Sequence, residues 1–151
     1  MTDCQEKTIN FDAPDVYHLY YGDERGLPGT IMTFFPFPGI RGGRNGIGQI
    51  NATSFSISMQ SLGYWQERLK RFSIPFSSPQ ERFDGEVSIY FQDFDGLGLE
   101  LVANPDDTRT GYIAPHIMPQ HAIKGFYGVS MLEEGNEKTG TFMSRFLDYE
   151  L

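Results

Sequence analysis

Apolar residues occur along this chain in short runs that alternate with polar residues, and Gly, Pro and Asp stand between the runs. Alternation with a period of two is typical of β-strands that bury one face. Turn-forming residues at the ends of the runs support the same interpretation. The pattern therefore predicts strands over residues 7–11, 16–21, 30–35, 49–57, 76–80, 86–91, 98–103 and 122–132.

Two segments have the helical period instead, with apolar positions three or four residues apart. The stripe of the first predicted helix consists of Leu62, Trp65, Leu69 and Phe72. The second predicted helix follows Asn136, which is a suitable N-cap residue. Its inner stripe is predicted to consist of Phe142, Met143, Phe146 and Leu147.

The clearest local signal lies in residues 91–102, which read F-Q-D-F-D-G-L-G-L-E-L-V. The Asp95-Gly96 pair between two apolar runs predicts a β-hairpin. On the second strand Glu100 faces away from its leucine neighbours, because side chains alternate along a strand. A carboxylate at this position suits a metal ligand or a general base, and it equally suits the solvent face of a sheet.

The predicted elements divide the chain into modules. Residues 1–38 form an incomplete βββ module, and residues 49–103 form a complete βαβββ module. A Pro-containing connector, residues 104–121, leads to a βα start of a further module in residues 122–151. The first and last pieces together contain the elements of one βαβββ unit, so one alternative is that residues 122–151 complete residues 1–38. The other is that open sheet edges are covered by a second molecule, as in a homodimer.

Composition narrows the classes of protein. A length of 151 residues suits one domain, and 15% aromatic residues suit a β-rich body with room for a flat ligand. The net charge of −8 argues against a nucleic-acid partner. No apolar run approaches the ~18 residues that a membrane span requires, and Cys4 is the only cysteine. We expect a cytoplasmic protein without a membrane partner.

Four segments carry a resemblance to a known family: residues 8–23 (TINFDAPDVYHLYYGD), 28–36 (PGTIMTFFP), 64–69 (Y-W-x-x-R-L) and 94–102 (FDGLGLELV). They resemble the bacterial ring-cleaving dioxygenases of the hydroquinone or extradiol type. This family belongs to the vicinal oxygen chelate superfamily, together with glyoxalase I and the bleomycin-resistance proteins. The resemblance implies an α+β fold in which βαβββ modules form a curved mixed sheet or open barrel.

The resemblance also implies a metal, usually Fe(II) or another divalent ion, held by two His and one Glu. Relatives are about twice as long, with four modules, and the family's three metal ligands have no clear counterpart in this chain. In the strand that begins the third module, Tyr127 and Gly128 stand where histidines would be expected. We therefore expect no metal cofactor for this chain alone.

The strand pattern and the family resemblance together suggest candidate site residues. His18 and Tyr20 share one strand face, and Phe35 ends the next predicted strand, so these three are candidates for binding a small aromatic ligand. His18 and Glu100 are candidate metal ligands only if they converge. We predict that the chain is related to metal-dependent enzymes that cleave hydroquinone or catechol-like rings. The isolated chain is not expected to catalyse this reaction. The alternatives are a non-enzymatic module that binds aromatic ligands, and a small metalloenzyme completed by a second subunit.

Overall fold

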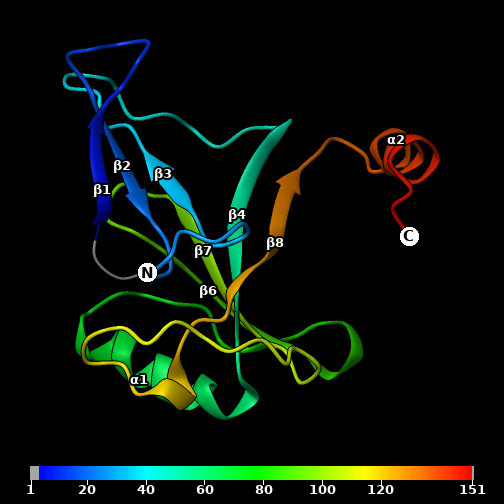
Figure 1. Cartoon of the computed structure of the whole chain (residues 1–151). Coiled ribbons are helices and arrows are strands. Elements are labelled where there is room, and N and C mark those ends of the chain that lie inside the picture. The colour runs from blue at the N-terminus through cyan, green and yellow to red at the C-terminus, as the bar shows by residue number, and fades with distance from the viewer. Residues whose placement is uncertain (1–3, 151) are drawn as a thin grey trace.

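The computed structural model describes residues 4–150, and its architecture is mixed α+β, as predicted (Figure 1). An antiparallel sheet has the order β1-β2-β3, and a mixed sheet has the order β5-β6-β7-β4-β8. The first sheet contains β1 (Cys4–Ile9), β2 (Tyr17–Tyr21) and β3 (Met32–Phe34). The second contains β4 (Gln49–Ile57), β5 (Gln80–Glu81), β6 (Val87–Gln92), β7 (Gly98–Ala103) and β8 (Gly125–Leu132). The helices are α1 (Leu62–Arg71) and α2 (Glu137–Leu147).

The complete module is built on a hairpin and a crossover. β6 and β7 pair antiparallel around the Asp95-Gly96 corner, where Gly96 has φ +86°, so the predicted hairpin is confirmed. The Asp93 carboxylate accepts hydrogen bonds from the amides of Asp95 and Leu97 at 2.9 and 2.8 Å, which fixes the turn. β4 lies parallel to β7, and parallel neighbours need a crossover connection, which α1 supplies.

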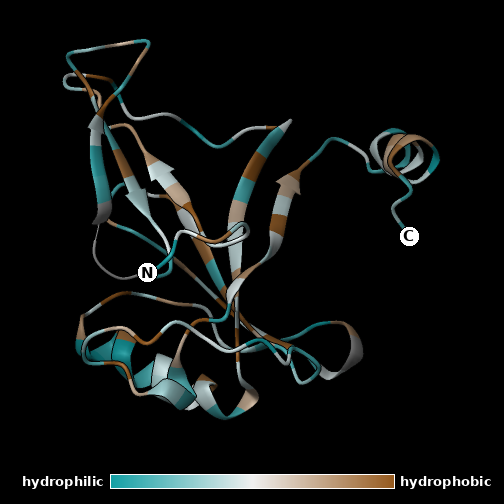
Figure 2. Ribbon diagram, in the orientation of Figure 1, coloured by the Kyte–Doolittle hydropathy of each residue, from teal (hydrophilic) through white to brown (hydrophobic). Residues whose placement is uncertain are grey.

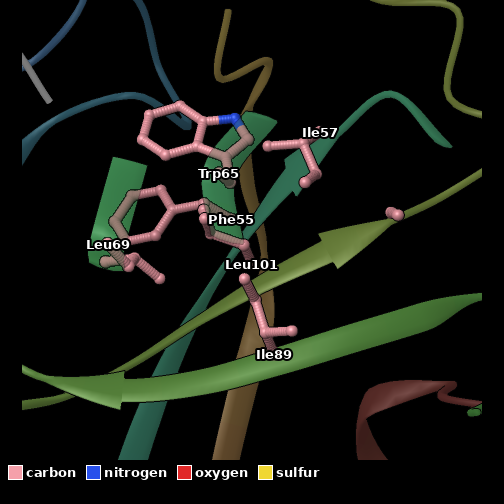
Figure 3. Close-up of a cluster of buried hydrophobic side chains, with 7 residues drawn as sticks. Phe55, Ile57, Trp65, Leu69, Ile89 and Leu101 are labelled. Atoms are coloured by element: carbon pink, nitrogen blue, oxygen red, sulfur yellow. The ribbon is translucent and has the colours of Figure 1, made fainter. Parts of the chain in front are cut away.

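The core lies between α1 and the mixed sheet. Figure 3 shows Trp65 and Leu69 projecting from α1 toward Phe55 and Leu101 of the strands. The core cluster consists of Phe55, Ile57, Trp65, Leu69, Ile89, Leu101 and Ala103. The apolar stripe predicted for α1 is therefore the face that it buries, except that Phe72 lies at the C-cap and is 51% exposed.

The strand predicted over residues 76–80 is wrong. Only Phe76 makes an isolated bridge, with Phe91, and regular pairing starts again at the two residues of β5. Pro75 precedes this segment and Pro79 lies within it. Because proline has no backbone N–H to give to a ladder, the pairing with β6 is interrupted here.

The strand of the last segment pairs with the complete module. β8 runs antiparallel to β4 at the edge of the mixed sheet, and Phe55 stacks on Phe126 at 5.1 Å. Figure 2 shows brown and paler or teal stretches alternating along β4 and β8, the expected strand pattern. Toward the sheet of β1–β3, the amide of Phe126 donates one hydrogen bond to the carbonyl of Gly29, at 3.1 Å. β8 is not paired with that sheet in the described residues.

The helix α2 does not close the structure, and its predicted inner stripe is wrong. None of its residues is buried, and Phe142, Phe146 and Leu147 are 54%, 66% and 53% exposed. Figure 1 shows α2 standing away from the rest of the molecule beyond the end of β8. The helix lies there because it directly follows β8, which pairs with β4.

Among the described residues, no helix is long and apolar enough to cross a membrane.

The connector contains the short 3-10 helix Pro119–His121, and side chains of neighbouring elements hold it in place. The Trp65 indole donates to the carbonyl of His121 at 3.0 Å, and the Ser61 hydroxyl donates to the carbonyl of Gln120 at 2.8 Å. Further along the connector, the Arg109 guanidinium holds the Asp107 carboxylate at 2.7 Å and also donates to the carbonyl of Phe126 at 3.1 Å. The connector is therefore tied to both α1 and β8.

We expect Asp107→Asn to lower the free energy of unfolding at pH 7 by about 1 kcal/mol, a modest value because Arg109 is half exposed. The hydrogen bond from Arg109 holds the pKa of Asp107 well below its usual value of 3.8. Because the folded pKa is lowered, this stabilisation is present above pH 3.8 and is lost as the pH falls through the folded pKa. Urea unfolding from pH 7 down to pH 2 checks this, because the loss begins below pH 3.8. A difference between the two proteins that stays constant with pH would contradict the ion-pair explanation.

Candidate functional site

The three residues predicted to bind an aromatic ligand lie together at the sheet of β1–β3. His18 and Tyr20 are two residues apart on β2 and therefore share a face. Their rings stack with centroids 4.0 Å apart, and the Tyr20 hydroxyl lies 2.8 Å from His18 Nδ1. Phe35, just after β3, places its ring 4.2 Å from the imidazole. The imidazole is thus held between two aromatic rings.

One nitrogen of this imidazole has no hydrogen-bond partner. His18 Nε2 is buried, and nothing within residues 4–150 accepts from it or donates to it. When the Tyr20 hydroxyl donates to Nδ1, the neutral imidazole carries its proton on Nε2. A buried, unpaired N–H costs free energy, so a ligand oxygen would gain a hydrogen bond at Nε2 once the atoms that cover this nitrogen move aside. When the Tyr20 hydroxyl instead accepts from Nδ1–H, Nε2 is an unpaired acceptor, so in either tautomer Nε2 lacks a partner.

Glu100 lies in the other sheet and is already paired. It is opposite Ser54 in the parallel register of β4 and β7, on the sheet face away from α1. Its Oε2 accepts from the Ser54 hydroxyl at 2.6 Å and from Arg82 Nη1 at 2.7 Å. The side chains of Arg82 and Glu100 are 24% and 13% exposed. In a partly buried site such a pair is a strong charge-assisted hydrogen bond.

A second carboxylate extends this network. The Tyr127 hydroxyl donates to Glu86 Oε2 at 2.6 Å, and the Arg82 guanidinium lies 5.3 Å from the centre of the Tyr127 ring. We name Ser54, Arg82, Glu86, Glu100 and Tyr127 the polar cluster. Sequence reasoning missed Arg82 and Glu86. The sequence does contain a signal for these two residues. They are four positions apart and stand just before β6, and β6 pairs with the strand that carries Glu100.

We expect Tyr127→Phe to lower the free energy of unfolding by about 1–2 kcal/mol, because Glu86 is 7% exposed and loses its donor. The hydrogen bond to Glu86, together with burial, raises the pKa of Tyr127 above its usual value of 10. A raised folded pKa gives stabilisation that is complete below pH 10 and is lost as the pH rises through the folded pKa. Tyrosinate absorbance during alkaline titration checks this, since the variant should lack the latest-titrating tyrosine. An unchanged titration curve would contradict it.

Comparison with known proteins decides the family, although no family model matches the chain. MhqO of Bacillus subtilis (strain 168), named as a ring-cleaving dioxygenase, is 39% identical over 145 residues, which are 96% of this chain and 46% of MhqO. The chlorohydroquinone/hydroquinone 1,2-dioxygenase of Sphingobium indicum is 36% identical over 143 residues, 91% of this chain and 44% of that enzyme. This chain is homologous to about half of a ring-cleaving dioxygenase. The resemblance predicted from four sequence segments is confirmed.

A crystal structure from Bacillus subtilis, named as a dioxygenase, supports the fold of this chain. It is 39% identical, superposes with a TM-score of 0.84 and covers 95% of this chain. Only 46% of that protein is matched. The chain spans just under half the length of the relatives that it matches.

The metal implied by the resemblance to ring-cleaving dioxygenases does not fit the residues that the structure describes. Among residues 4–150, no group of three His, Cys, Asp or Glu side chains could hold a metal ion. His18 belongs to the sheet of β1–β3, whereas Glu100 is engaged by Arg82 and Ser54 in the mixed sheet. His121 stacks on Tyr64 at 4.2 Å in the connector. We therefore derive no chemical step through a metal from these residues.

Proposed function

We propose that this chain takes part in metal-dependent cleavage of hydroquinone or catechol-like rings as one portion of a larger catalytic unit, and that it does not cleave rings by itself. One observation carries the proposal: the chain is 39% identical to a named ring-cleaving dioxygenase over nearly its whole length. The absence of a three-ligand group within residues 4–150 supports the second half of the proposal. The metal ligands would come from outside these residues.

Within that unit, His18, Tyr20 and Phe35 are proposed to contact the aromatic substrate. A hydroquinone offers a flat face and hydroxyl groups. The exposed ring of Phe35 suits the flat face, and Nε2 of His18 suits a hydroxyl oxygen. Tyr20 positions the imidazole through its hydrogen bond to Nδ1.

The proposal is tested on the purified chain after anaerobic reconstitution with Fe(II). Metal content per chain, molecular mass by size-exclusion light scattering and oxygen uptake with hydroquinone are measured on one sample. We expect less than one retained metal per ten chains and no oxygen uptake above the metal-only blank. One metal per chain or per dimer, with turnover, would instead support a small metalloenzyme completed by a second subunit.

A second candidate function is a non-enzymatic module that binds small aromatic ligands. The observation that favours it is the buried, unpartnered Nε2 of His18 beside two aromatic rings. Ligand binding stabilises the folded state by RT ln(1 + [L]/Kd), which is about 2.7 kcal/mol at a ligand concentration 100 times Kd. Hydroquinone should therefore raise the melting temperature of the wild type and not that of His18→Gln. The exposed His116 provides the matched control, His116→Gln, which should respond as the wild type does.

A further inference from the structure

A cavity of about 340 Å³ lies where the β2–β3 loop, the connector and the start of β8 meet. Phe55, Ile117 and Ile123 are among the apolar side chains that line it, and polar side chains of the β2–β3 loop and the connector line it as well. None of His18, Glu100 or the other residues discussed above as ring or metal ligands lines it. Small-molecule pockets measure about 300–1,000 Å³, so this cavity suits a single substituted ring.

The loop that forms one wall is held in place before any ligand arrives. The Asp23 carboxylate accepts hydrogen bonds from the amides of Arg25 and Leu27, both at 3.0 Å. The Thr30 hydroxyl donates to the carbonyl of Leu27 at 2.7 Å. The bond from the Phe126 amide to the carbonyl of Gly29 fastens the loop to β8. A wall ordered in advance reduces the entropy that binding must overcome.

Hydrogen-bond donors dominate the polar groups that remain free around the cavity. Among residues 4–150 the Arg25 guanidinium has no side-chain or backbone partner, and the hydroxyls of Thr110 and Tyr112 have none either. The Lys124 ammonium donates to the carbonyl of Asp107, and no carboxylate within residues 4–150 forms an ion pair with it. Of the two acids in the lining, Asp23 is occupied by backbone amides, and Glu24 is exposed.

We propose that this cavity binds a single-ring aromatic carboxylate. The ring would lie against the apolar lining at Phe55 and Ile123, and the carboxylate would accept hydrogen bonds from Arg25 and Tyr112. A guanidinium is suited to a carboxylate because its N–H groups match the two oxygens. The site goes beyond the proposed function, since it shares no residue with the proposed ring-cleavage contacts.

Benzoate is the probe, and binding to the full chain is measured by calorimetry and by amide chemical-shift mapping. A ligand of this size should bind with a Kd of about 1 mM or below. We expect shifts concentrated in residues 22–30 and 110–125. Arg25→Gln should weaken binding about tenfold and Tyr112→Phe several-fold, whereas Glu24→Gln should strengthen it. Arg41→Gln, a change at an exposed arginine outside the cavity, is the matched control and should leave Kd unchanged.

Three results would overturn the proposal: no saturable binding of benzoate, shifts outside the cavity lining, or equal affinity for benzamide, which would remove the role of the charge. The His18→Gln variant separates this site from the proposed function. Benzoate binding should survive in that variant while the response to hydroquinone is lost. Loss of the hydroquinone response in Arg25→Gln instead would show that both ligands use the cavity, which would also overturn the separate carboxylate site.

Discussion

Replacing Gly98 by alanine is expected to lower the free energy of unfolding by about 3 kcal/mol. Gly98 begins β7, where the chain leaves the Asp95-Gly96 corner and meets β4. A Cβ at this position would lie 2.1 Å from the carbonyl oxygen of Asn51 and 3.0 Å from the Tyr90 hydroxyl. The first neighbour is backbone, so a rotamer change cannot relieve the clash. β4 and β7 would have to separate near their shared end.

The matched control is Gly63→Ala. Gly63 lies in the first turn of α1, and a Cβ there would meet nothing within 4 Å. Alanine favours the helix more than glycine does, so this variant should gain about 0.5 kcal/mol. Equilibrium urea unfolding of the two variants and the wild type gives both values. A loss below 1 kcal/mol in Gly98→Ala would contradict the prediction, because it would mean that β4 and β7 separate at this point at little cost in free energy.

Trp65→Ala is expected to have the second large effect, a loss of about 4 kcal/mol in the free energy of unfolding. Trp65 is 7% exposed and packs among the strand residues of the core cluster. Its removal leaves a cavity and also frees the end of the connector, because the indole N–H no longer holds the carbonyl of His121. The variant should therefore become sensitive to proteolysis within residues 104–121 before it unfolds globally.

Two further variants separate packing from the hydrogen bond. Trp65→Phe keeps most of the apolar volume and loses the donor, so we expect about half of the full destabilisation together with the same proteolytic sensitivity. Phe72→Ala removes a side chain of the predicted stripe that is half exposed, and it should cost less than 1 kcal/mol. Equal losses from Trp65→Ala and Phe72→Ala would refute this assignment of the core.

Local elements of the fold could be predicted where neighbouring residues determine them. The Asp95-Gly96 hairpin and α1 follow from turn chemistry and from helical spacing within about ten residues. The partner of β4 could not be read in this way, because its contacts with β7 and β8 join segments more than forty residues apart. The strand expected over residues 76–80 is interrupted because Pro75 and Pro79 lack the backbone N–H groups that a regular ladder uses, and this signal is local.

In the candidate site, too, local relations could be predicted from the sequence and long-range contacts could not. His18 and Tyr20 could be placed on one face because alternation along a strand is local, and Phe35 joins them in the structure. Glu100 could be placed opposite the leucines for the same reason. Its pairing with Ser54 and Arg82 depends on the register of β4 against β7 and on the turn before β6, which no local pattern encodes. The roles of His18, Tyr20, Phe35 and Glu100 in binding stay predictions.

The helix α2 has 11 residues and buries none of them. A helix of that length without tertiary support is marginal in water, because nucleation is costly and few hydrogen bonds repay it. Its amides should therefore exchange with deuterium at nearly the rates of a free peptide, while those of α1 report global unfolding. The enthalpy of thermal unfolding should likewise fall short of the value expected for the full chain length. Contact of another surface with Phe142 and Phe146 would be detected first as slower amide hydrogen exchange in α2.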